Sequence, residues 1–497
     1  MLSIKPKWKR GKGPPRWRTV DELIEQIQSY DPEADTDIVK LAYEFAEHAH
    51  EGQKRANGDP YFTHAVATAA RLADIKLDTT TIAAALLHDV VEDTNCTYDE
   101  LKKEFGKEIA NLVINVSKLS SIKYRGLERY LENIRKVFIA MAQDIRVVLI
   151  KLSDRIHNLS TLSALRPEKQ MRIAKESLEV YAPIANRLGI GEFKGEIEDL
   201  SFRYVYPDEF HKTQLMFQEH YPHAEKFLDK ASKTIKHEFN KANIPIESVH
   251  GRKKHLYSLW KKLQRPELEG DITKIHDLVA LRIIVPDITA CYTALGFIHK
   301  LWKPLKGRIK DYIAQPKPNG YQSIHTTVFG PHGRIIEIQI RDKEMHELAE
   351  YGVAAHWHYS EFIKGNKSKT PPQKMYKWMK ELTNWKKEFE HDKNYLETLK
   401  IDVFKNQIFV FTPDGDVVEL PEDATPVDFA YRVHTDIGNK CTGAKVNDKI
   451  APLDTPLKSG DVVEIIKDKN RKGPNPDWLS FVKTNSAQEH IRKAKKK

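Results

Sequence analysis

The stretch TIAAALLHDVVED, residues 81–93, decides how the first part of the chain is read. Small and aliphatic side chains fill it as far as Leu87, and THAVATAARLA at residues 63–73 has the same character. Apolar residues in both stretches recur at spacings of three and four instead of alternating, which is typical of buried helices. This texture continues over residues 37–205. We therefore expect an all-helical domain there.

Length and composition limit the classes of protein that fit this chain. Its 497 residues are enough for three or four compact domains, at roughly 100 to 200 residues each. Hydrophobic residues make up 40% and charged residues 30%, which suits packed cores and excludes a disordered chain. The formal net charge of +10 favours polyanionic partners such as nucleotides or RNA.

Cysteine usage and the N-terminal residues indicate the compartment. Cys96, Cys291 and Cys441 lie far apart and match neither a disulfide framework nor a metal ribbon, so we expect a reducing cytoplasm. The basic N-terminal residues lack the apolar segment of a secretory signal, and nowhere do 18 apolar residues run together. We expect a soluble protein without membrane association, whose oligomeric state the sequence leaves open.

We expect a helical bridge at residues 206–243. Beyond it, runs of β-branched residues replace the helical spacing. LVALRIIVP at residues 278–286, HTTVFG at 325–330 and IIEIQIR at 335–341 are typical of strands, and helical or loop segments separate them. Together they predict a mixed α/β domain over residues 244–363.

Smaller parts complete the predicted organisation, besides a basic segment at residues 1–36. Residues 364–403 read as a flexible Ser/Lys/Pro-rich joint followed by an amphipathic helix with one apolar stripe. Short strands with turns at TPDGD and LKSGD predict a β-rich module at residues 404–467. Residues 468–497 read as a solvated basic segment. The apolar stripe consists of Met375, Trp378, Leu382, Trp385 and Phe389.

Histidines and aspartates of the helical domain form a first candidate site. His64, the pair His88 and Asp89, and Asp154 lie far apart in sequence, so only folding can bring them together. Imidazole and carboxylate ligands without a thiolate favour manganese or a similar divalent ion over structural zinc. The sequence therefore predicts a metal centre built on helices.

Two further carboxylates follow at helical spacing. Glu92 comes four residues after His88 and Asp93 four after Asp89, which predicts one acidic face. Such crowding is costly unless a cation neutralises it, and a metal also activates water near neutral pH, so the pattern favours phosphoester hydrolysis. A lone HD pair is usually an ordinary feature, but YFTHAVATA, LLHDVVEDT and KLSDRIHNLSTL in this order resemble HD-type metallophosphohydrolases.

A second candidate site gathers cations and aromatic residues in the α/β domain. GRKKHLYSLWKK at residues 251–262 is by itself compatible with an ordinary basic helix face. GRIKDYIAQPKPNGYQSIHTT at residues 307–327 adds cations and a turn that presents Tyr321 for stacking on a base. The combination favours the binding of a phosphorylated nucleotide.

Carboxylates in or beside the predicted strands complete this second site. Alternation in IIEIQIR sets Glu337 on the face opposite the isoleucines, together with Gln339 and Arg341. Asp277 is a second possible ligand for Mg²⁺, although it could instead cap a helix or a turn. Two carboxylates among many cations favour phosphoryl-group transfer.

The whole chain from about residue 20 onward closely resembles the long RelA/SpoT-type enzymes, bifunctional synthetase-hydrolases of the alarmone (p)ppGpp. The motifs HDVVED, SDRIHN, YAPIANRLG, GRKKHLYS, KDYIAQPKPNGYQSIHTT, IEIQIR and MHELAEYGVAAHWHY follow in family order. The resemblance implies pyrophosphate transfer from ATP to the 3′-hydroxyl of GDP or GTP, and hydrolysis of (p)ppGpp to GDP or GTP plus pyrophosphate. It also implies a multidomain α and α+β fold. Its parts are an all-helical HD hydrolase domain, a helical bridge, a nucleotidyltransferase-like synthetase domain with a mixed sheet, and a small β-grasp-like TGS domain.

Residue roles follow from the resemblance and not from spacing. In the hydrolase it implies Mn²⁺ ligands, an acidic pair that positions or activates water, and two residues that hold the guanosine part. The implied Mn²⁺ ligands are His64, His88, Asp89 and Asp154. The acidic pair is Glu92 and Asp93, and the guanosine contacts are Arg55 and Asn158. The family motif DRLHNMRT appears here as DRIHNLST, so Ser160 replaces its arginine and leaves the details of the pocket open.

In the synthetase the resemblance implies contacts with ATP, a Mg²⁺ site and a guanine platform. The ATP contacts are Arg252, Lys254, Ser258 and Lys262, and the Mg²⁺ ligands are Asp277 and Glu337, the latter also assisting deprotonation of the acceptor hydroxyl. Tyr321 would stack on guanine, with Arg308, Lys310, Asn319, His325 and Gln339 nearby. The family motif RFKD appears here as RIKD, which keeps both cations and replaces the aromatic residue.

The module at residues 408–467 resembles TGS domains, which implies contact with deacylated tRNA on the ribosome. Its basic residues favour such a partner, whereas His434 could equally pack inside the module. The family continues with helical, zinc-finger and ACT-type domains, and we interpret this chain as a shortened form. An alternative is a tRNA- or ribosome-binding regulator with one or both catalytic domains inactive. A hydrolase of another nucleotide is a third reading, which Tyr321 and Glu337 oppose.

Overall fold

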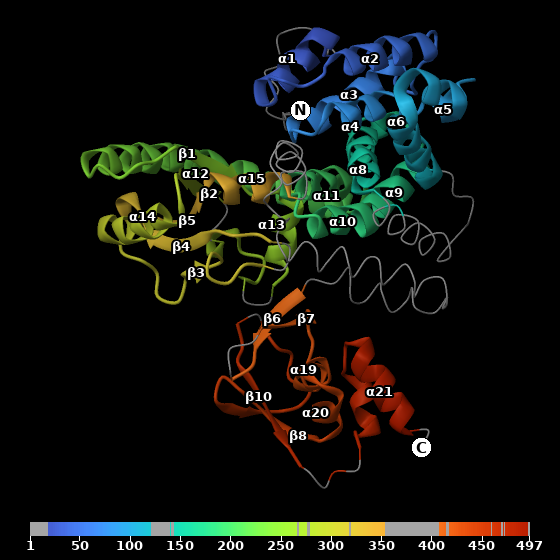
Figure 1. The fold of residues 1–497 in the computed structure, drawn as a ribbon. Helices are drawn as coiled ribbons and strands as arrows, with labels where there is room; N and C mark the ends of the chain where they lie inside the picture. Colours follow the sequence, from blue (N-terminus) through green and yellow to red (C-terminus); the bar gives the residue numbers. More distant parts are fainter. Residues whose placement is uncertain are drawn as a thin grey trace. The chain divides into compact units, whose positions relative to one another are not determined.

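The computed structural model describes residues 18–120, 140, 144–265, 268–275, 279–317, 320–352, 407–413, 417–458, 460–468, 471 and 473–495. The chain divides into two compact units, Met1–Thr383 and Asn384–Lys497, drawn in Figure 1. The predicted joint and amphipathic helix at residues 364–403, including Met375 to Phe389, lie outside the described residues.

Helices build the first part of the first unit, from blue to green in Figure 1. Aliphatic side chains such as Leu72, Ile82 and Leu152 are fully buried between them, because their spacing places them on one face of each helix. The predicted all-helical domain is confirmed. Its helices are α1 (Val20–Tyr30), α2 (Asp37–Ala49), α3 (Phe62–Asp74), α4 (Thr79–Leu86), α5 (Val90–Asp93), α6 (Tyr98–Ser120), α8 (Ile145–Ser160), α9 (Pro167–Glu176), α10 (Ala182–Arg187) and α11 (Gly191–Val205).

The first of these helices corrects the prediction of a separate basic segment at residues 1–36. Thr19 and Glu22 form a reciprocal capping box at the start of α1. Leu23 and Ile27, four residues apart, are buried at 0% and 1% exposure against the domain. The basic composition of the preceding residues hid this short amphipathic pattern.

The HDVVED stretch is not one continuous helix. Helix α4 ends at Leu86, and His88 and Asp89 lie in the turn before α5. This turn buries His88 and leaves Glu92 and Asp93 exposed at the short α5. The single continuous helix expected here is therefore wrong at His88 and Asp89, whereas Asp93 still follows Asp89 by one helical turn, with its N–H 2.9 Å from the Asp89 carbonyl.

A five-stranded mixed sheet forms the second part of the first unit. The strand order is β1-β2-β5-β4-β3, in which β2 and β5 are parallel and the other neighbours are antiparallel. The predicted mixed sheet is confirmed. Its strands are β1 (Ser248–Lys253), β2 (Val279–Val285), β3 (Lys310–Asp311), β4 (Ile324–Phe329) and β5 (Ile335–Asp342), and its helices are α13 (Leu256–Leu263), α14 (Ile288–Leu301) and α15 (Lys343–Tyr351).

Helix α12 (Pro207–Lys241) is 35 residues long and is more than the predicted bridge. Its second half contributes Phe227, Ala231, Ile235 and Phe239 to the core that covers one face of the sheet. These residues recur every four positions and form a stripe that packs in one core with the isoleucines of β5. The sheet domain therefore begins, in packing terms, within this helix.

Strand β5 follows the predicted alternation. Ile336, Ile338 and Ile340 are fully buried in the core. On the other face Gln339 and Arg341 are only 3% and 1% exposed, so this polar face is covered as well. Buried polar groups need hydrogen-bond partners, which makes the second face a region of specific polar contacts.

The second unit contains a two-stranded sheet and a three-stranded sheet of order β10-β8-β9. A parallel bridge between Phe411 and Val462 joins them, in agreement with the predicted small β-sheet module. His434 is exposed and accepts a hydrogen bond from the Asp436 N–H, so it is not a packing residue. The elements are β6 (Gln407–Phe411), β7 (Val417–Pro421), α19 (Pro426–Val433), α20 (Thr435–Asn439), β8 (Cys441–Val446), β9 (Lys449–Ala451), β10 (Val463–Lys467), the 3₁₀ turn η6 (Pro476–Ser480) and α21 (Asn485–Lys495).

The C-terminal residues correct another prediction, that of a solvated basic segment at residues 468–497. Trp478, Val482, Ala487 and Ile491 pack into the core of the module beside Tyr431. Their apolar side chains lie on the buried side of this segment, whereas Arg492 and Lys493 of α21 are exposed. The basic composition concealed the buried stripe.

Asp428 fastens this segment to α19. Its fully buried carboxylate accepts hydrogen bonds from the backbone N–H groups of Thr425, Lys483 and Thr484, at 2.8, 2.9 and 2.7 Å. The hydroxyls of Thr425 and Thr484 donate to it as well. One carboxylate thus satisfies three backbone donors on two segments of the module.

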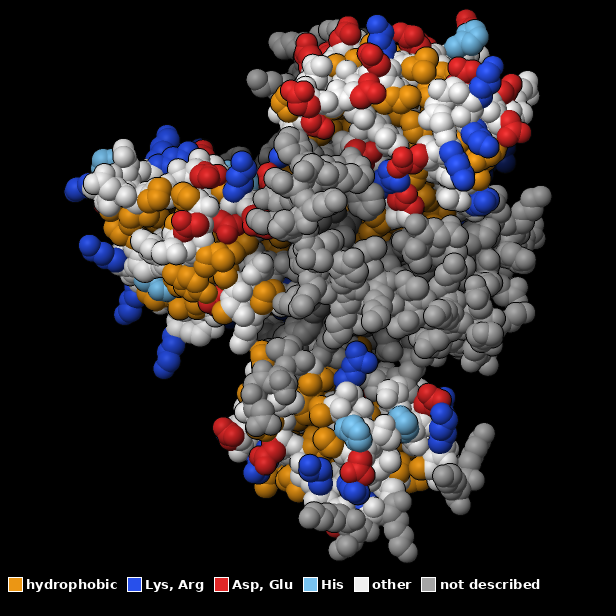
Figure 2. All heavy atoms as spheres, viewed as in Figure 1, with side chains coloured by type: hydrophobic (Ala, Val, Ile, Leu, Met, Phe, Trp, Pro, Cys, Tyr) orange, Lys and Arg blue, Asp and Glu red, His pale blue; other side chains and the backbone are white. Residues whose placement is uncertain are grey.

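Among the described residues, no helix is long and apolar enough to cross a membrane. Figure 2 shows acidic and basic side chains mixed over the visible face of each described part. The net charge of +10 is therefore not gathered into one large patch on that face.

Asp428→Ala should loosen α21, because it leaves three buried N–H groups without an acceptor. The loss should lower the free energy of opening α21 by about 2 kcal/mol. Amide exchange in α21, measured by hydrogen–deuterium exchange, should therefore accelerate roughly 30-fold. Asp477→Ala, at an exposed acidic residue of η6, is the matched control and should leave exchange unchanged. Equal exchange in the wild type and Asp428→Ala would contradict the fastening role.

Candidate functional sites

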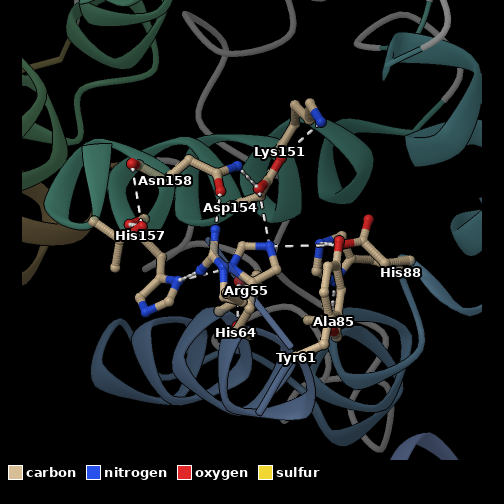
Figure 3. Close-up of polar contacts among 12 residues, drawn as sticks. Arg55, Tyr61, His64, Ala85, His88, Lys151, Asp154, His157 and Asn158 are labelled. Atoms are coloured by element: carbon tan, nitrogen blue, oxygen red, sulfur yellow. Dashed lines mark hydrogen bonds and ion pairs between the residues drawn. The ribbon is translucent and has the colours of Figure 1, made fainter. Parts of the chain in front are cut away.

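Three residues of the helical domain meet at one point (Figure 3). His64 from α3, His88 from the turn after α4 and Asp154 from α8 each offer a ligand atom, and these atoms lie within 4.8 Å of one another. All three side chains are buried, with exposures of 2%, 1% and 3%. Residues far apart in sequence thus form the cluster that the pattern of histidines and aspartates predicted.

Asp89, the fourth predicted ligand, lies beside both imidazoles. Its Oδ2 is 3.2 Å from His88 Nε2 and 3.5 Å from His64 Nε2. The Tyr61 hydroxyl lies 2.9 Å from the same oxygen and 2.6 Å from Asp93 Oδ2. Tyr61 therefore ties Asp93 to the cluster, while Glu92 is exposed on α5.

Burial and charge shape the protonation of this cluster. Burial lowers the pKa of His64. Burial acts in the same direction on His88, but the Asp89 carboxylate outweighs it and raises the pKa of His88 to about 9. Burial alone would raise the pKa of Asp154, but Lys151, whose Nζ is 2.6 Å away, holds it well below its usual value. A cation held here would compete with the proton on His88.

The donor set fits a divalent ion. His88 Nδ1 donates a hydrogen bond to the Ala85 carbonyl at 2.8 Å, which leaves the lone pair of the neutral ring on the inward Nε2. That buried Nε2 has no hydrogen-bond partner of good geometry in the described structure. Imidazole nitrogens with carboxylate oxygens and no thiolate suit a first-row divalent metal.

Arg55, in the loop before α3, contacts two residues of α8 at the edge of the cluster. Its guanidinium group donates to Asn158 Oδ1 at 2.6 Å and to His157 Nδ1 at 2.8 Å, and Asn158 Nδ2 donates to Asp154. Burial, then the neighbouring charges of His64 and Arg55, lowers the pKa of His157 to about 2. The two residues predicted to hold guanosine are thus in direct contact.

Sequence reasoning missed three residues of this cluster. They are Tyr61, Lys151 and His157, and each lies three residues from a predicted ligand, Tyr61 before His64 and the other two on either side of Asp154. Helical spacing of three places such residues on the ligand's own side, so this signal was present in the sequence.

A second cluster lies on the polar face of β4 and β5. Glu337 Oε1 is 3.1 Å from His325 Nδ1 and accepts a hydrogen bond from Gln339 Nε2 at 3.1 Å. The other ring nitrogen of His325 is 2.8 Å from the Tyr321 hydroxyl. Four predicted residues of the synthetase site thus form one connected chain.

Two cations contact the ring of Tyr321. Lys317 Nζ lies 4.8 Å and the Arg341 guanidinium 5.4 Å from the ring centroid, and Lys317 is also 4.7 Å from the ring centroid of Tyr312. Burial, followed by repulsion from Lys310, lowers the pKa of Lys317 to about 8. The sequence analysis identified Tyr321 and placed Arg341 on the polar face of β5, but it predicted neither the contact of Arg341 with the ring nor that of Lys317.

A pair of buried arginines adds positive charge behind this face. Arg282 Nη1 is 2.8 Å from Glu350 Oε1, and Arg341 Nη1 is 3.8 Å from the same oxygen. Burial, then Arg341, lowers the pKa of Arg282 to about 10. One carboxylate shared by two guanidinium groups leaves net positive charge, which suits a polyphosphate ligand.

Three family profiles match this chain, and two of them cover the segments that contain the two clusters. The HD domain profile matches residues 42–191, the profile described as a region found in RelA/SpoT proteins matches 251–364, and the TGS profile matches 408–467. A guanosine-3′,5′-bis(diphosphate) 3′-pyrophosphohydrolase of Aquifex aeolicus is 45% identical over 96% of this chain and 67% of its own length. This chain belongs to the RelA/SpoT family.

Other members of the RelA/SpoT family are equally similar. A GTP pyrophosphokinase of Myxococcus xanthus is 47% identical over 94% of this chain and 61% of its own length. The bifunctional (p)ppGpp synthase/hydrolase SpoT of Escherichia coli is 47% identical over 95% and 66%. The chain thus spans 61% to 67% of the length of these relatives. Among solved structures, the small alarmone synthetase 2 of Bacillus subtilis is 28% identical over 37% of this chain and 93% of its own, with a TM-score of 0.23.

The residues that the RelA/SpoT resemblance assigned to ATP lie at β1 and α13. Arg252 is exposed on β1, and Lys254 follows that strand, whereas Ser258 and Lys262 lie on α13. The Ser258 hydroxyl donates to Glu198 of α11 at 3.5 Å. Arg308 and Lys310 are exposed at the β3 edge, and Asp277 and Asn319 lie outside the described residues.

Helix α11 also fixes the start of α13. Asp199 Oδ2 is 2.8 Å from His255 Nδ1, and Asp199 Oδ1 accepts from the Tyr257 N–H at 2.9 Å. A Cβ at Gly195 would lie 2.2 Å from the ring of His255, so only glycine permits this approach. The helical domain thus contacts the RelA/SpoT segment that carries the predicted ATP residues.

Proposed function

We propose that this chain both makes and degrades (p)ppGpp, at two separate centres. It would transfer the pyrophosphate of ATP to the 3′-hydroxyl of GDP or GTP, and it would hydrolyse (p)ppGpp to GDP or GTP plus pyrophosphate. The observation that carries the proposal is that one polypeptide contains both the His64, His88 and Asp154 cluster and the Tyr321, His325 and Glu337 chain. Relatives named for each activity support it.

In the hydrolase centre, His64, His88, Asp89 and Asp154 would hold one Mn²⁺. Such an ion, when bound, supplies Lewis acidity to the phosphate and promotes ionisation of water. Asp93, oriented by the Tyr61 hydroxyl, would accept the proton of the attacking water. Glu92, at the solvent edge, would assist it.

Substrate positioning in the hydrolase centre would fall to Arg55 and Asn158. Their contact at 2.6 Å joins the 50–60 loop to α8, so both can hold the guanosine part of the alarmone at once. Arg55 would contact the substrate while keeping its contact with His157, because a guanidinium group donates to several acceptors.

In the synthetase centre, Glu337 would accept the proton of the acceptor 3′-hydroxyl. His325 and Gln339 hold its carboxylate by contacts of 3.1 Å. A carboxylate held in this way enters the reaction already oriented, which lowers the reorganisation needed in the transition state. The guanine base would stack on Tyr321.

The ATP side of the synthetase centre would use cations and one Mg²⁺. Asp277 and Glu337 would hold that ion, whose hard character suits carboxylates and phosphates. Arg252, Lys254, Ser258 and Lys262 would bind ATP, with Arg308 and Lys310 at the sheet edge and Asn319 nearby. Positioning and charge neutralisation carry most of the catalysis in such transfers.

The two centres should be separable by single substitutions. Glu337→Gln should lower (p)ppGpp synthesis by about 100-fold or more and spare hydrolysis, because the amide keeps the shape but cannot accept the proton. Asp89→Ala should abolish hydrolysis and spare synthesis. The measurement follows both reactions on each purified variant with Mn²⁺ and Mg²⁺ present.

Two outcomes would contradict the separation. Loss of both activities in either folded variant would show one shared centre. Absence of both reactions in the wild-type chain would instead favour a regulator with inactive catalytic domains.

The synthetase should lose efficiency above pH 8. The pKa of Lys317 is lowered to about 8, so its positive charge disappears as the pH rises through that value. If Lys317 binds the acceptor's phosphates, kcat/KM for GDP should fall about fivefold between pH 8 and 9. Lys317→Arg keeps its charge and should flatten this decline, and the same slope in both proteins would exclude Lys317 as its source.

The TGS module would bind deacylated tRNA, and through it the ribosome, in the cytoplasm. Support comes from the TGS match and from the exposed His434. Fluorescence anisotropy should detect binding of deacylated tRNA and a clear loss on removal of its 3′-terminal adenosine or in His434→Ala. Equal affinity for intact and shortened tRNA would reject recognition of the 3′ end, and cell fractionation tests the location.

A further inference from the structure

The imidazole of His157 contacts both His64 and Arg55 in the proposed hydrolase centre (Figure 3). It extends from α8 toward α3, and its Nδ1 is 2.7 Å from His64 Nδ1 and 2.8 Å from Arg55 Nη1. The two imidazole rings are 4.9 Å apart between centroids and inclined by 32°. Three nitrogen atoms thus converge, and the placement of their protons decides whether the contacts attract or repel.

Arg55 determines that placement, because a guanidinium group can only donate hydrogen bonds. Its contact requires a lone pair on His157 Nδ1, so the proton of the neutral His157 ring is on Nε2. A lone pair on His64 Nδ1 would then face another lone pair at 2.7 Å. His64 Nδ1 must instead carry a proton, and this N–H donates a hydrogen bond to His157 Nδ1.

This hydrogen bond leaves the lone pair of His64 on Nε2. That nitrogen lies 3.2 Å from Asp154 Oδ1 and 3.5 Å from Asp89 Oδ2. A lone pair beside two anionic oxygens is repulsive unless a cation lies among them, so the arrangement is prepared for a metal ion. The opposite tautomer would turn an N–H toward the ion and could not bind it.

We propose that His157 is a positioning residue that fixes the metal-binding tautomer of His64. It would act through His64 and would not itself touch the ion. The inference rests on the proposed hydrolase centre and adds a determinant of its affinity for divalent metal. Lys151 and the Ala85 carbonyl would play the corresponding parts for Asp154 and His88, by contacts of 2.6 and 2.8 Å.

The test is a Mn²⁺ titration of the full chain followed by electron paramagnetic resonance. His157→Leu removes the acceptor, whereas the side-chain oxygen of His157→Asn lies near the place of Nδ1 and can accept the same hydrogen bond. The dissociation constant for Mn²⁺ should rise about 10- to 100-fold in His157→Leu and stay within about threefold of wild type in His157→Asn. His48→Leu, at a histidine 88% exposed in the same domain, is the matched control.

The outcomes separate this inference from the function on which it rests. No Mn²⁺ binding by the wild-type chain would contradict the metal centre itself. Wild-type affinity in His157→Leu would overturn the role of His157, and equal weakening in Leu and Asn variants would reject the hydrogen bond as its cause. Synthetase activity of each variant reports folding, and His157→Gln, which displaces the acceptor, replaces His157→Leu if that variant does not fold.

Discussion

The burial of Asp154 is the constraint on which the HD domain depends. A carboxylate 3% exposed is costly unless charges or hydrogen bonds compensate it. Lys151 approaches one oxygen at 2.6 Å, Asn158 donates to the other, and a metal ion would join that second oxygen to His64 Nε2, which lies 3.2 Å away. These partners come from two helices, so α3 and α8 must pack in one register for the carboxylate to be tolerated. The same register assembles the ligand cluster.

Helix α11 connects this cluster to the sheet domain. Its Glu196 forms an ion pair with Arg71 of α3, the helix that carries His64. One turn along, Asp199 holds His255 and the N–H of Tyr257 at the start of α13. A rigid helix thus contacts elements of both centres, and Gly195 allows the close approach. A displacement of α13 on nucleotide binding would therefore press on α11, which also contacts α3, the helix of His64.

Local patterns predicted much of each site, and their failures have physical causes. The alternation in β5 correctly placed Glu337 and Gln339 opposite the isoleucines, because the side-chain period of a strand is strict. The helical reading of HDVVED failed because nothing local marks the turn after Leu86. The basic composition at both ends of the chain led to the wrong prediction of solvated segments. Burial of two apolar side chains per helix, such as Leu23 and Ile27, is enough to dock each helix, and the charged side chains can remain in solvent.

The sequence by itself determined the fold class, the family resemblance and the chemical identity of the groups at both centres, since these depend on residue type, order and periodicity. Tertiary structure alone decided which groups meet. The contact of His157 with His64 and Arg55, the fastening of α21 by Asp428 and the cations around Tyr321 join residues from separate elements. The reason is physical: hydrogen bonds and charges act over a few ångströms, and packing of distant segments brings those atoms within range.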